Sequence, residues 1–170
     1  MSADTSSAVY PWFALTTRTG QEKLALRALQ GLGYEGFQPT RTVRRRWSDR
    51  FKEIEAPLFP GYVFCRFDPY NRLPVLKAPG VTAIVTFGKT ILPVDELEIE
   101  AIRRLVASGF PLYPAPFLKA GQRVRIEEGA LAGIEGILME VRNKRRVVAS
   151  ISLLQRSVSV EIDPSWLRVL

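Results

Sequence analysis

The segment from Pro57 to Phe64, Pro-Leu-Phe-Pro-Gly-Tyr-Val-Phe, constrains the fold more than any other stretch of this 170-residue chain. Pro60 fixes its own φ and lacks a backbone donor, and Gly61 permits a positive φ, so a turn should precede a strand that begins at Tyr62. Successive strand residues point to opposite faces, so Tyr62 and Phe64 share one face. The segment predicts an aromatic patch open to a partner, or alternatively a set of core aromatics.

Composition and charge restrict the kinds of partner. The chain is 46% hydrophobic and 24% charged, which is typical of globular proteins, and its length suits one ordinary domain or two small ones. It holds 24 Lys and Arg against 17 Asp and Glu, a formal net charge of +7. An excess of this size favours a polyanion such as nucleic acid, or an acidic protein surface.

Catalytic and metal-binding chemistry has little support. There is no histidine and one cysteine, Cys65, which rules out His/Cys zinc sites, Ser-His-Asp and Cys-His arrangements and an intrachain disulfide. Glu53 and Glu55 alternate with Ile54 on an expected strand, and we do not read them as an acid–base pair. We therefore expect no enzyme and no cofactor or metal, with Cys65 a buried thiol. Without a leader peptide or a run of about 18 apolar residues, the chain is predicted to be cytoplasmic, with no membrane contact.

Strands and helices interleave in the N-terminal half. A helix is expected over 21–31, because Thr19 and Glu22 have capping-box spacing and apolar residues follow at helical intervals. Asp95 and Glu98 repeat that spacing before a second helix, which ends at Gly109. The other expected elements are strands over 10–16, 62–67 and 81–86, a hairpin of 40–47 and 51–55 with its tip at 48–50, and a short helix over 70–77. This order predicts a mixed sheet with helices on one side.

The C-terminal part is predicted to be all-β. Three prolines between 110 and 117 favour a semi-rigid linker, and β-branched residues dominate after Lys119 in a meander of about five short strands. The alternation over 157–162 favours a small closed barrel over a helical hairpin. The predicted organisation is a disordered segment over 1–8, a domain over 9–109, a linker over 110–117 and a barrel over 118–170.

Two groups of motifs resemble one family. The segments 10–15, 18–23, 57–64, 78–81 and 87–89 are similar to the NusG family of transcription elongation factors, and 124–137 resembles the KOW motif that completes those proteins. The resemblance implies an α+β fold, in which a mixed α/β NusG N-terminal domain, a sheet flanked by helices, precedes a small SH3-like KOW barrel. It also implies a monomeric transcription factor.

The resemblance implies a contact with RNA polymerase. In NusG-like proteins an aromatic patch binds the polymerase clamp helices and suppresses pausing. Carried over to this chain, that role falls on Trp12, Phe13, Phe59, Tyr62 and Phe64. Aromatic side chains suit such a contact because they bury much area at little entropic cost. A second contact, to the polymerase gate loop, would come from residues 71–76.

Two further sets of residues are candidate contacts. The basic hairpin is expected to hold upstream or non-template DNA, mainly through its phosphates, with an aromatic free to stack on an unpaired base. Its candidate residues are Arg41, Arg44, Arg45, Arg46, Trp47, Arg50 and Lys52; the alternative is a solvated charged face. In the barrel, Leu153, Leu154 and Arg156 lie where NusG contacts ribosomal protein NusE or Rho, although Leu154 replaces an aromatic residue.

The segments 46–50, 57–60, 67–69 and 85–88 are similar to the specialised UpxY and RfaH-like members. That similarity implies operon-specific antitermination. The alternatives are a housekeeping NusG-type factor that couples polymerase to Rho or the ribosome, and, from another class, a ribosome-associated KOW protein that binds RNA. The latter would need the aromatic residues to be core.

Overall fold

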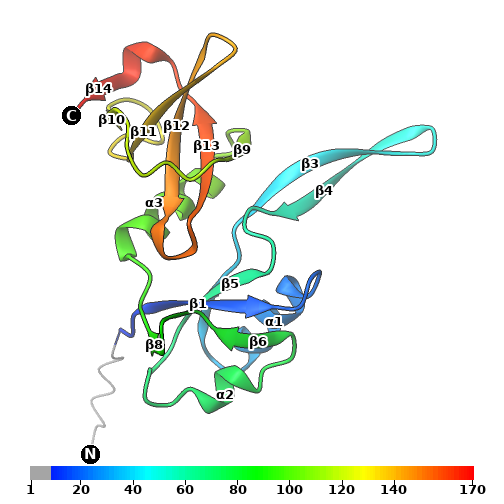
Figure 1. Ribbon diagram of the computed structural model, residues 1–170. Coiled ribbons are helices and arrows are strands. Elements are labelled where there is room, and N and C mark those ends of the chain that lie inside the picture. Colours follow the sequence, from blue (N-terminus) through cyan, green and yellow to red (C-terminus); the bar gives the residue numbers. More distant parts are fainter. Residues whose placement is uncertain (1–8) are drawn as a thin grey trace, which may run out of the picture. The chain divides into compact units, whose positions relative to one another are not determined.

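The structure is a computed structural model that describes residues 9–170 (Figure 1). These residues form two compact units, each discontinuous in sequence: the first comprises 9–38 and 60–94, and the second comprises 39–59 and 95–170. The predicted disordered segment 1–8 lies outside the described residues. The predicted domain boundaries at 109 and 118 stay a prediction. The contact-based division is a different one, because it places the hairpin segment 39–59 and residues 95–109 in one unit with the C-terminal strands.

A four-stranded sheet organises the first unit. Its strands are β1 (Trp12–Thr17), β2 (Glu35–Phe37), β5 (Tyr62–Arg66) and β6 (Val81–Ile84), in the order β2-β5-β1-β6. All three pairings are antiparallel, so the expectation of a mixed sheet is wrong. The other elements of this unit are α1 (Glu22–Gly31), a single-turn helix α2 (Leu73–Leu76), and the small ladder of β7 (Thr86–Phe87) with β8 (Thr90–Ile91).

One face of this sheet packs on its helices. Val63 and Cys65 of β5 join Ala25 and Leu29 of α1 and Val75 of α2 in a single buried cluster. Val63 and Cys65 therefore point to the core, which confirms the prediction that Cys65 is a buried thiol. The predicted helix over 70–77 is wrong in extent, because only Leu73–Leu76 is helical.

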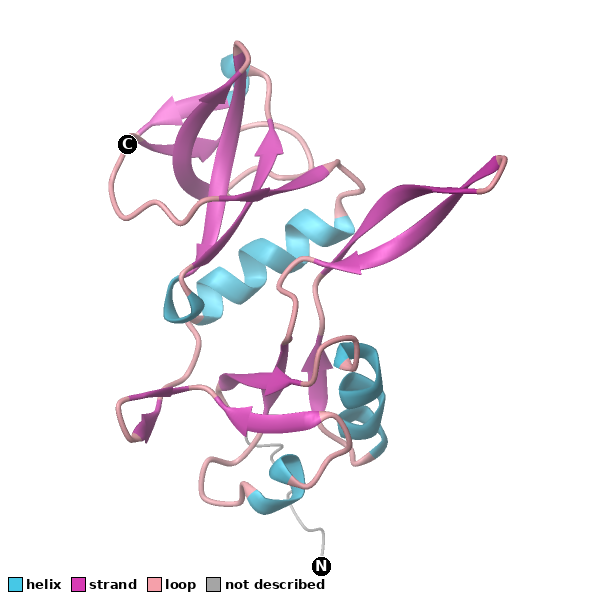
Figure 2. Cartoon of the chain, turned by 45° about the vertical axis from the view of Figure 1, so that its right-hand side comes forward, coloured by secondary structure: helices cyan, strands magenta, loops and turns pink. Residues whose placement is uncertain are grey.

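The second unit begins with a long hairpin. Strands β3 (Thr40–Trp47) and β4 (Arg50–Pro57) pair over their whole length, and Figure 2 shows them as an extended twisted ribbon. Two residues, Ser48 and Asp49, make the turn, with Ser48 at φ 49°. The predicted hairpin is therefore confirmed, with a tip one residue shorter than predicted, because Arg50 already pairs with Trp47.

The rest of the second unit is α3 (Glu96–Ala107) and a six-stranded antiparallel sheet, the C-terminal sheet. The order β14-β10-β11-β12-β13-β9 joins β9 (Leu112–Ala115), β10 (Arg123–Ile126), β11 (Glu135–Val141), β12 (Lys144–Ile151), β13 (Arg156–Glu161) and β14 (Leu167–Val169). Two 3-10 turns, η1 (Ser152–Leu154) and η2 (Pro164–Trp166), complete it. The prediction of strands rather than a helical hairpin is confirmed.

The segment predicted as a linker contributes a strand. Residues 112–115 form β9, which pairs with β13 at the edge of the C-terminal sheet. Pro114 lies opposite Val158 in this ladder. An edge strand tolerates proline because one side of its backbone needs no donor. The prolines therefore exclude a central strand here but allow an edge strand.

Candidate functional site

The aromatic residues predicted to meet the polymerase lie mainly on neighbouring strands of the first unit. Tyr62 pairs with Thr16 and Phe64 with Ala14, so both aromatics share a sheet face with Trp12. Trp12 and Phe64 are fully buried, and Tyr62 is partly exposed. Arg66 stacks its guanidinium 4.6 Å from the Trp12 ring centroid, and the Phe37 and Phe64 ring centroids lie 6.2 Å apart.

The other two predicted contact residues are also buried. Phe13 points to the opposite sheet face, into the helix-covered core, where its ring centroid lies 4.7 Å from that of Phe67. Phe59 is buried and belongs to the second unit. Of the five residues, then, only Tyr62 offers exposed surface. Because side chains alternate along β1, Phe13 points to the helix-covered face of the sheet. On the opposite face, Trp12, Ala14 and Phe64 are also buried, so that face is interior as well.

Glu22, which the sequence assigned to a capping box, instead anchors the turn before Tyr62. The α1 N-cap is Gln21, without a side-chain cap, so the assignment of Thr19 is wrong. The Glu22 side chain is only 4% exposed, and its Oε1 accepts a hydrogen bond of 2.9 Å from the Gly61 amide. The Gly61 carbonyl in turn accepts from the Thr17 amide at 2.8 Å. Gly61 takes φ 82°, a conformation that favours glycine.

Cys65 is a structural thiol. It is fully buried in the core of the first unit. Desolvation, with a smaller contribution from the charge of Glu35, raises the pKa of Cys65 to about 12. The thiolate needed for nucleophilic chemistry is therefore suppressed at neutral pH.

The β3–β4 hairpin segregates its charges by face. Residues directly opposite one another share a face, and alternate residues along each strand do the same. One face, here the Trp47 face, carries Arg41, Val43, Arg45, Trp47, Arg50, Lys52 and Ile54. The other, the Phe51 face, carries Thr42, Arg44, Arg46, Phe51, Glu53 and Glu55. The Trp47 face thus has cations and no carboxylate, whereas the Phe51 face balances two arginines against two glutamates.

Each hairpin face also bears an exposed aromatic ring. Trp47 is 64% exposed, with the Lys52 ammonium 5.8 Å from its ring centroid. Phe51 is 59% exposed and lies under the Arg44 guanidinium at 4.4 Å. Arg41, near the base, donates to the Leu112 carbonyl at 3.2 Å and so has a structural role. The remaining cations of the Trp47 face, with an exposed indole among them, can hold phosphates while the ring stacks on a base.

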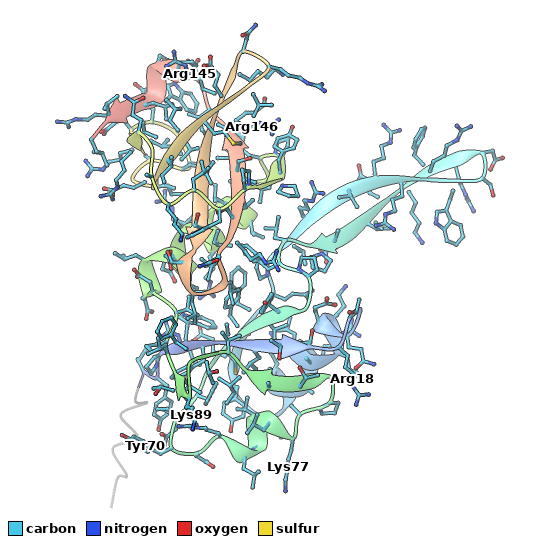
Figure 3. The ribbon with its side chains drawn as sticks, viewed as in Figure 1. Arg18, Tyr70, Lys77, Lys89, Arg145 and Arg146 are labelled. Atoms are coloured by element: carbon cyan, nitrogen blue, oxygen red, sulfur yellow. The ribbon has the colours of Figure 1, made fainter. Side chains whose placement is uncertain are left out.

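The predicted second polymerase contact, residues 71–76, includes α2. Leu73 and Leu76 of α2 are both exposed, and the neighbouring Tyr70 is 96% exposed (Figure 3). Asp68 accepts a hydrogen bond of 2.9 Å from the Tyr70 amide, so it stabilises the turn and does not cap the helix.

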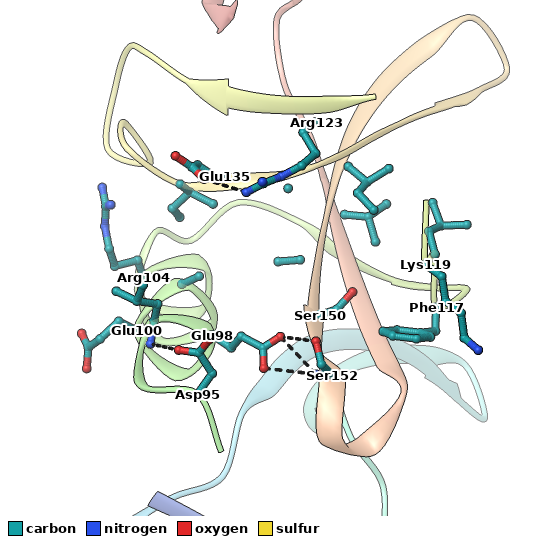
Figure 4. Close-up of a pocket in the computed structure, with 18 of the residues that line it drawn as sticks. Asp95, Glu98, Glu100, Arg104, Phe117, Lys119, Arg123, Glu135, Ser150 and Ser152 are labelled. Atoms are coloured by element: carbon teal, nitrogen blue, oxygen red, sulfur yellow. Dashed lines mark hydrogen bonds and ion pairs between the residues drawn. The ribbon is translucent and has the colours of Figure 1, made fainter. Parts of the chain in front are cut away.

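The predicted partner loop of the C-terminal sheet is η1 and the start of β13. Leu153 and Leu154 are half-buried and Arg156 is exposed. Glu98 of α3 accepts from the Ser152 hydroxyl at 2.6 Å and from the Ser152 amide at 3.1 Å, which fixes the first residue of η1 (Figure 4). Asp95 caps α3 through the Leu97 amide at 2.9 Å, as its spacing with Glu98 predicted.

A cleft of about 900 Å³ lies between α3 and the C-terminal sheet. Four of its charged side chains have internal partners: Glu98 binds Ser152, Arg123 binds Glu135 at 3.1 Å, and Arg104 donates to the carbonyls of Ala130 and Ala132. Within residues 9–170, no group of three His, Cys, Asp or Glu side chains is placed to hold a metal ion. No helix in the same part of the chain is long and apolar enough to cross a bilayer.

Comparisons with known proteins point to one family. Residues 10–103 match the family model described as transcription termination factor nusG. The transcription termination/antitermination protein NusG of Lactococcus lactis is 29% identical over 165 residues, covering 89% of each chain. The Thermus thermophilus protein of the same name is 29% identical over 176 residues, covering 89% of this chain and 94% of its own.

A solved structure shares the fold. The structure described as "Domain interaction in Thermotoga maritima NusG" superposes with a TM-score of 0.55 at 24% identity, over 93% of this chain and 96% of its own. This agrees with the predicted α+β N-terminal region followed by an all-β C-terminal region. The family consists of transcription factors that are not enzymes, which agrees with the prediction of no enzyme activity. The chain belongs to the NusG family of transcription termination and antitermination factors.

Proposed function

We propose that this chain is a transcription elongation factor that binds RNA polymerase and that contacts nucleic acid through the Trp47 face of its β3–β4 hairpin. The observation that carries the proposal is the charge segregation of that hairpin. Arg45, Arg50 and Lys52 share a face with the exposed Trp47 and with no carboxylate. A charged hairpin that only faces solvent does not need its cations on one face. Binding a single strand of DNA, in contrast, requires cations and a stacking ring on the same side.

The polymerase contact is proposed to centre on Tyr62. It is the one predicted contact residue with exposed surface, and the Glu22–Gly61 hydrogen bond fixes the turn that presents it. The similarity to proteins named NusG supports polymerase as the partner, and the clamp helices are the contact that the family resemblance implies. The exposed residues Tyr70, Leu73 and Leu76 support a second contact, with the gate loop.

The regulatory outcome is proposed to be operon-specific antitermination, as in the UpxY and RfaH-like members that segments 46–50 and 57–60 resemble. The second candidate is a housekeeping factor that couples polymerase to NusE or Rho. The half-buried Leu153 and Leu154 beside exposed Arg156 favour it, because they offer a small amphipathic contact on η1.

The test compares the two faces of one hairpin. In reconstituted elongation complexes, we expect Arg45→Gln/Arg50→Gln to reduce crosslinking to non-template DNA. The salt dependence of that crosslinking should become weaker, by the equivalent of roughly one to two phosphate contacts. The matched control is Arg44→Gln/Arg46→Gln, which removes the same charge from the Phe51 face and should have the smaller effect. Polymerase binding should persist in both variants. Equal losses from the two faces, or none from either, would reject the assignment of the Trp47 face.

A further inference from the structure

The hairpin of β11 and β12 extends beyond the rest of the C-terminal sheet. β10 pairs with β11 only up to Ile137, and β13 pairs with β12 only from Arg146 onward. The β11–β12 ladder nevertheless continues through Glu140–Arg145 and Val141–Lys144. The last two rungs and their turn, residues 140–145, therefore have no strand paired beside them, although the Arg145 carbonyl accepts a hydrogen bond of 3.1 Å from the Ile162 amide. With the residues at their base they form a projecting two-stranded tip, the β11–β12 tip (residues 138–146).

Part of the positive charge of this tip serves the fold. Arg146 forms an ion pair with Glu161 at 3.1 Å, and its guanidinium lies 4.0 Å from the Tyr113 ring centroid. Lys144 lies 3.7 Å from the other oxygen of the same carboxylate. Glu161 thus offsets both cations and joins the base of the tip to β13.

Two arginines lie outside that arrangement. Arg142 and Arg145 are exposed, and among residues 9–170 no carboxylate lies within ion-pair distance of either; Figure 3 labels Arg145. Arg142 and Asn143 make the turn at φ 49° and 63°, the left-handed geometry of a tight two-residue hairpin. A left-handed conformation is uncommon for arginine.

We propose that the β11–β12 tip is a second nucleic-acid site, in which Arg142 and Arg145 bind the phosphodiester backbone. The tip carries four cations and one carboxylate, Glu140. It has no exposed aromatic ring, so the contact is to phosphates rather than to bases. Arginine matches phosphate oxygens with two parallel donors, which suits a short tip with few contacts.

An acidic protein surface fits the tip less well than nucleic acid does. Protein interfaces have an apolar or aromatic centre surrounded by polar residues. No residue of the tip is a large exposed hydrophobic side chain, since Leu138, Met139 and Val141 are half-buried. Binding to a phosphate backbone needs only charge and reach, and a projecting basic tip supplies both.

The experiment uses the full chain and two probes of mixed sequence, a fluorescent single-stranded RNA and a fluorescent DNA duplex. The variant Arg142→Asn/Arg145→Gln keeps a residue that tolerates the left-handed turn and removes both charges. We expect its affinity to fall about tenfold at low salt, and the slope of log affinity against log salt to fall by about 1.4 on RNA or about 1.8 on duplex. Arg142→Lys/Arg145→Lys should retain most of the affinity.

The matched control is Arg18→Gln/Lys77→Gln, which removes two exposed charges from the first unit. Loss by the tip variant alone, on either probe, supports the site and identifies RNA or DNA as its ligand. Equal losses of affinity in the tip and control variants would mean that only the net charge of the chain matters, and would overturn the proposal. Unchanged affinity for both probes would overturn it too, and an accompanying loss of polymerase binding would assign the tip to a protein surface.

Discussion

At the scale of single residues, the position of Tyr62 depends on a carboxylate far away in sequence. Glu22 lies on α1, and its hydrogen bond to Gly61 spans 39 residues. Sequence spacing suggested a local cap for this residue, because a glutamate in a first helical turn usually has that role. Nothing in a linear pattern indicates that the acceptor will instead meet a glycine amide between two other elements. The buried carboxylate is therefore a positioning residue that only the structure identifies.

We expect Glu22→Ala to lower the free energy of unfolding by about 1–3 kcal/mol, because it leaves the Gly61 amide without its acceptor. Glu22→Gln keeps an acceptor oxygen and should recover most of that loss. Both are measured by urea unfolding, beside polymerase pull-down. Tyr62→Ala is the control for the pull-down, and should weaken polymerase binding by about 1–3 kcal/mol with the stability little changed. If Glu22→Ala were as stable as wild type, the hydrogen bond would have no role in holding the turn.

At the scale of elements, the sequence predicted most helices and strands, and the failures have physical causes. Helix α3 begins after Asp95 and the β3–β4 hairpin turns at Ser48, because capping and alternation are local signals. β9 was missed because proline excludes a strand only in a sheet interior. The burial of four of the five aromatic residues was not predictable for another reason. A period of two shows which residues share a face, but not whether that face is covered.

The predicted KOW motif contains a glycine that the C-terminal sheet requires. A Cβ on Gly136 would lie 2.4 Å from the Val148 carbonyl oxygen and 2.7 Å from Cγ1 of Val147. We expect Gly136→Ala to destabilise the chain by about 1–3 kcal/mol, since the backbone of β12 must shift to admit the methyl group. Gly31→Ala is the matched control, because nothing lies within 4 Å of its Cβ and its φ is not positive. Thermal unfolding of both variants measures the difference, and Gly136→Ala should have the lower melting temperature. Equal melting temperatures would contradict the argument that Gly136 is closely packed.

At the scale of the whole molecule, the positive charge is concentrated on two hairpins. Residues 41–55 hold six cations and three carboxylates, and residues 138–146 hold four cations and one carboxylate. Together they account for six of the seven net positive charges of the chain. A general excess of charge, kept only for solubility, would be spread over the surface. The concentration instead favours two separate phosphate-binding elements on one factor.

Two such elements predict a binding stoichiometry. With a single-stranded oligonucleotide of about eight nucleotides, long enough for one small site, the wild-type chain should bind two molecules at low salt. Arg45→Gln/Arg50→Gln and Arg142→Asn/Arg145→Gln should each bind one, and the quadruple variant none. A longer oligonucleotide that reaches both hairpins should bind wild type more tightly than either double variant, because the second contact becomes intramolecular. Calorimetric titration measures both quantities. A wild-type stoichiometry of one short oligonucleotide, lost entirely in either double variant, would show that the hairpins form a single site and would replace two independent elements with one composite surface.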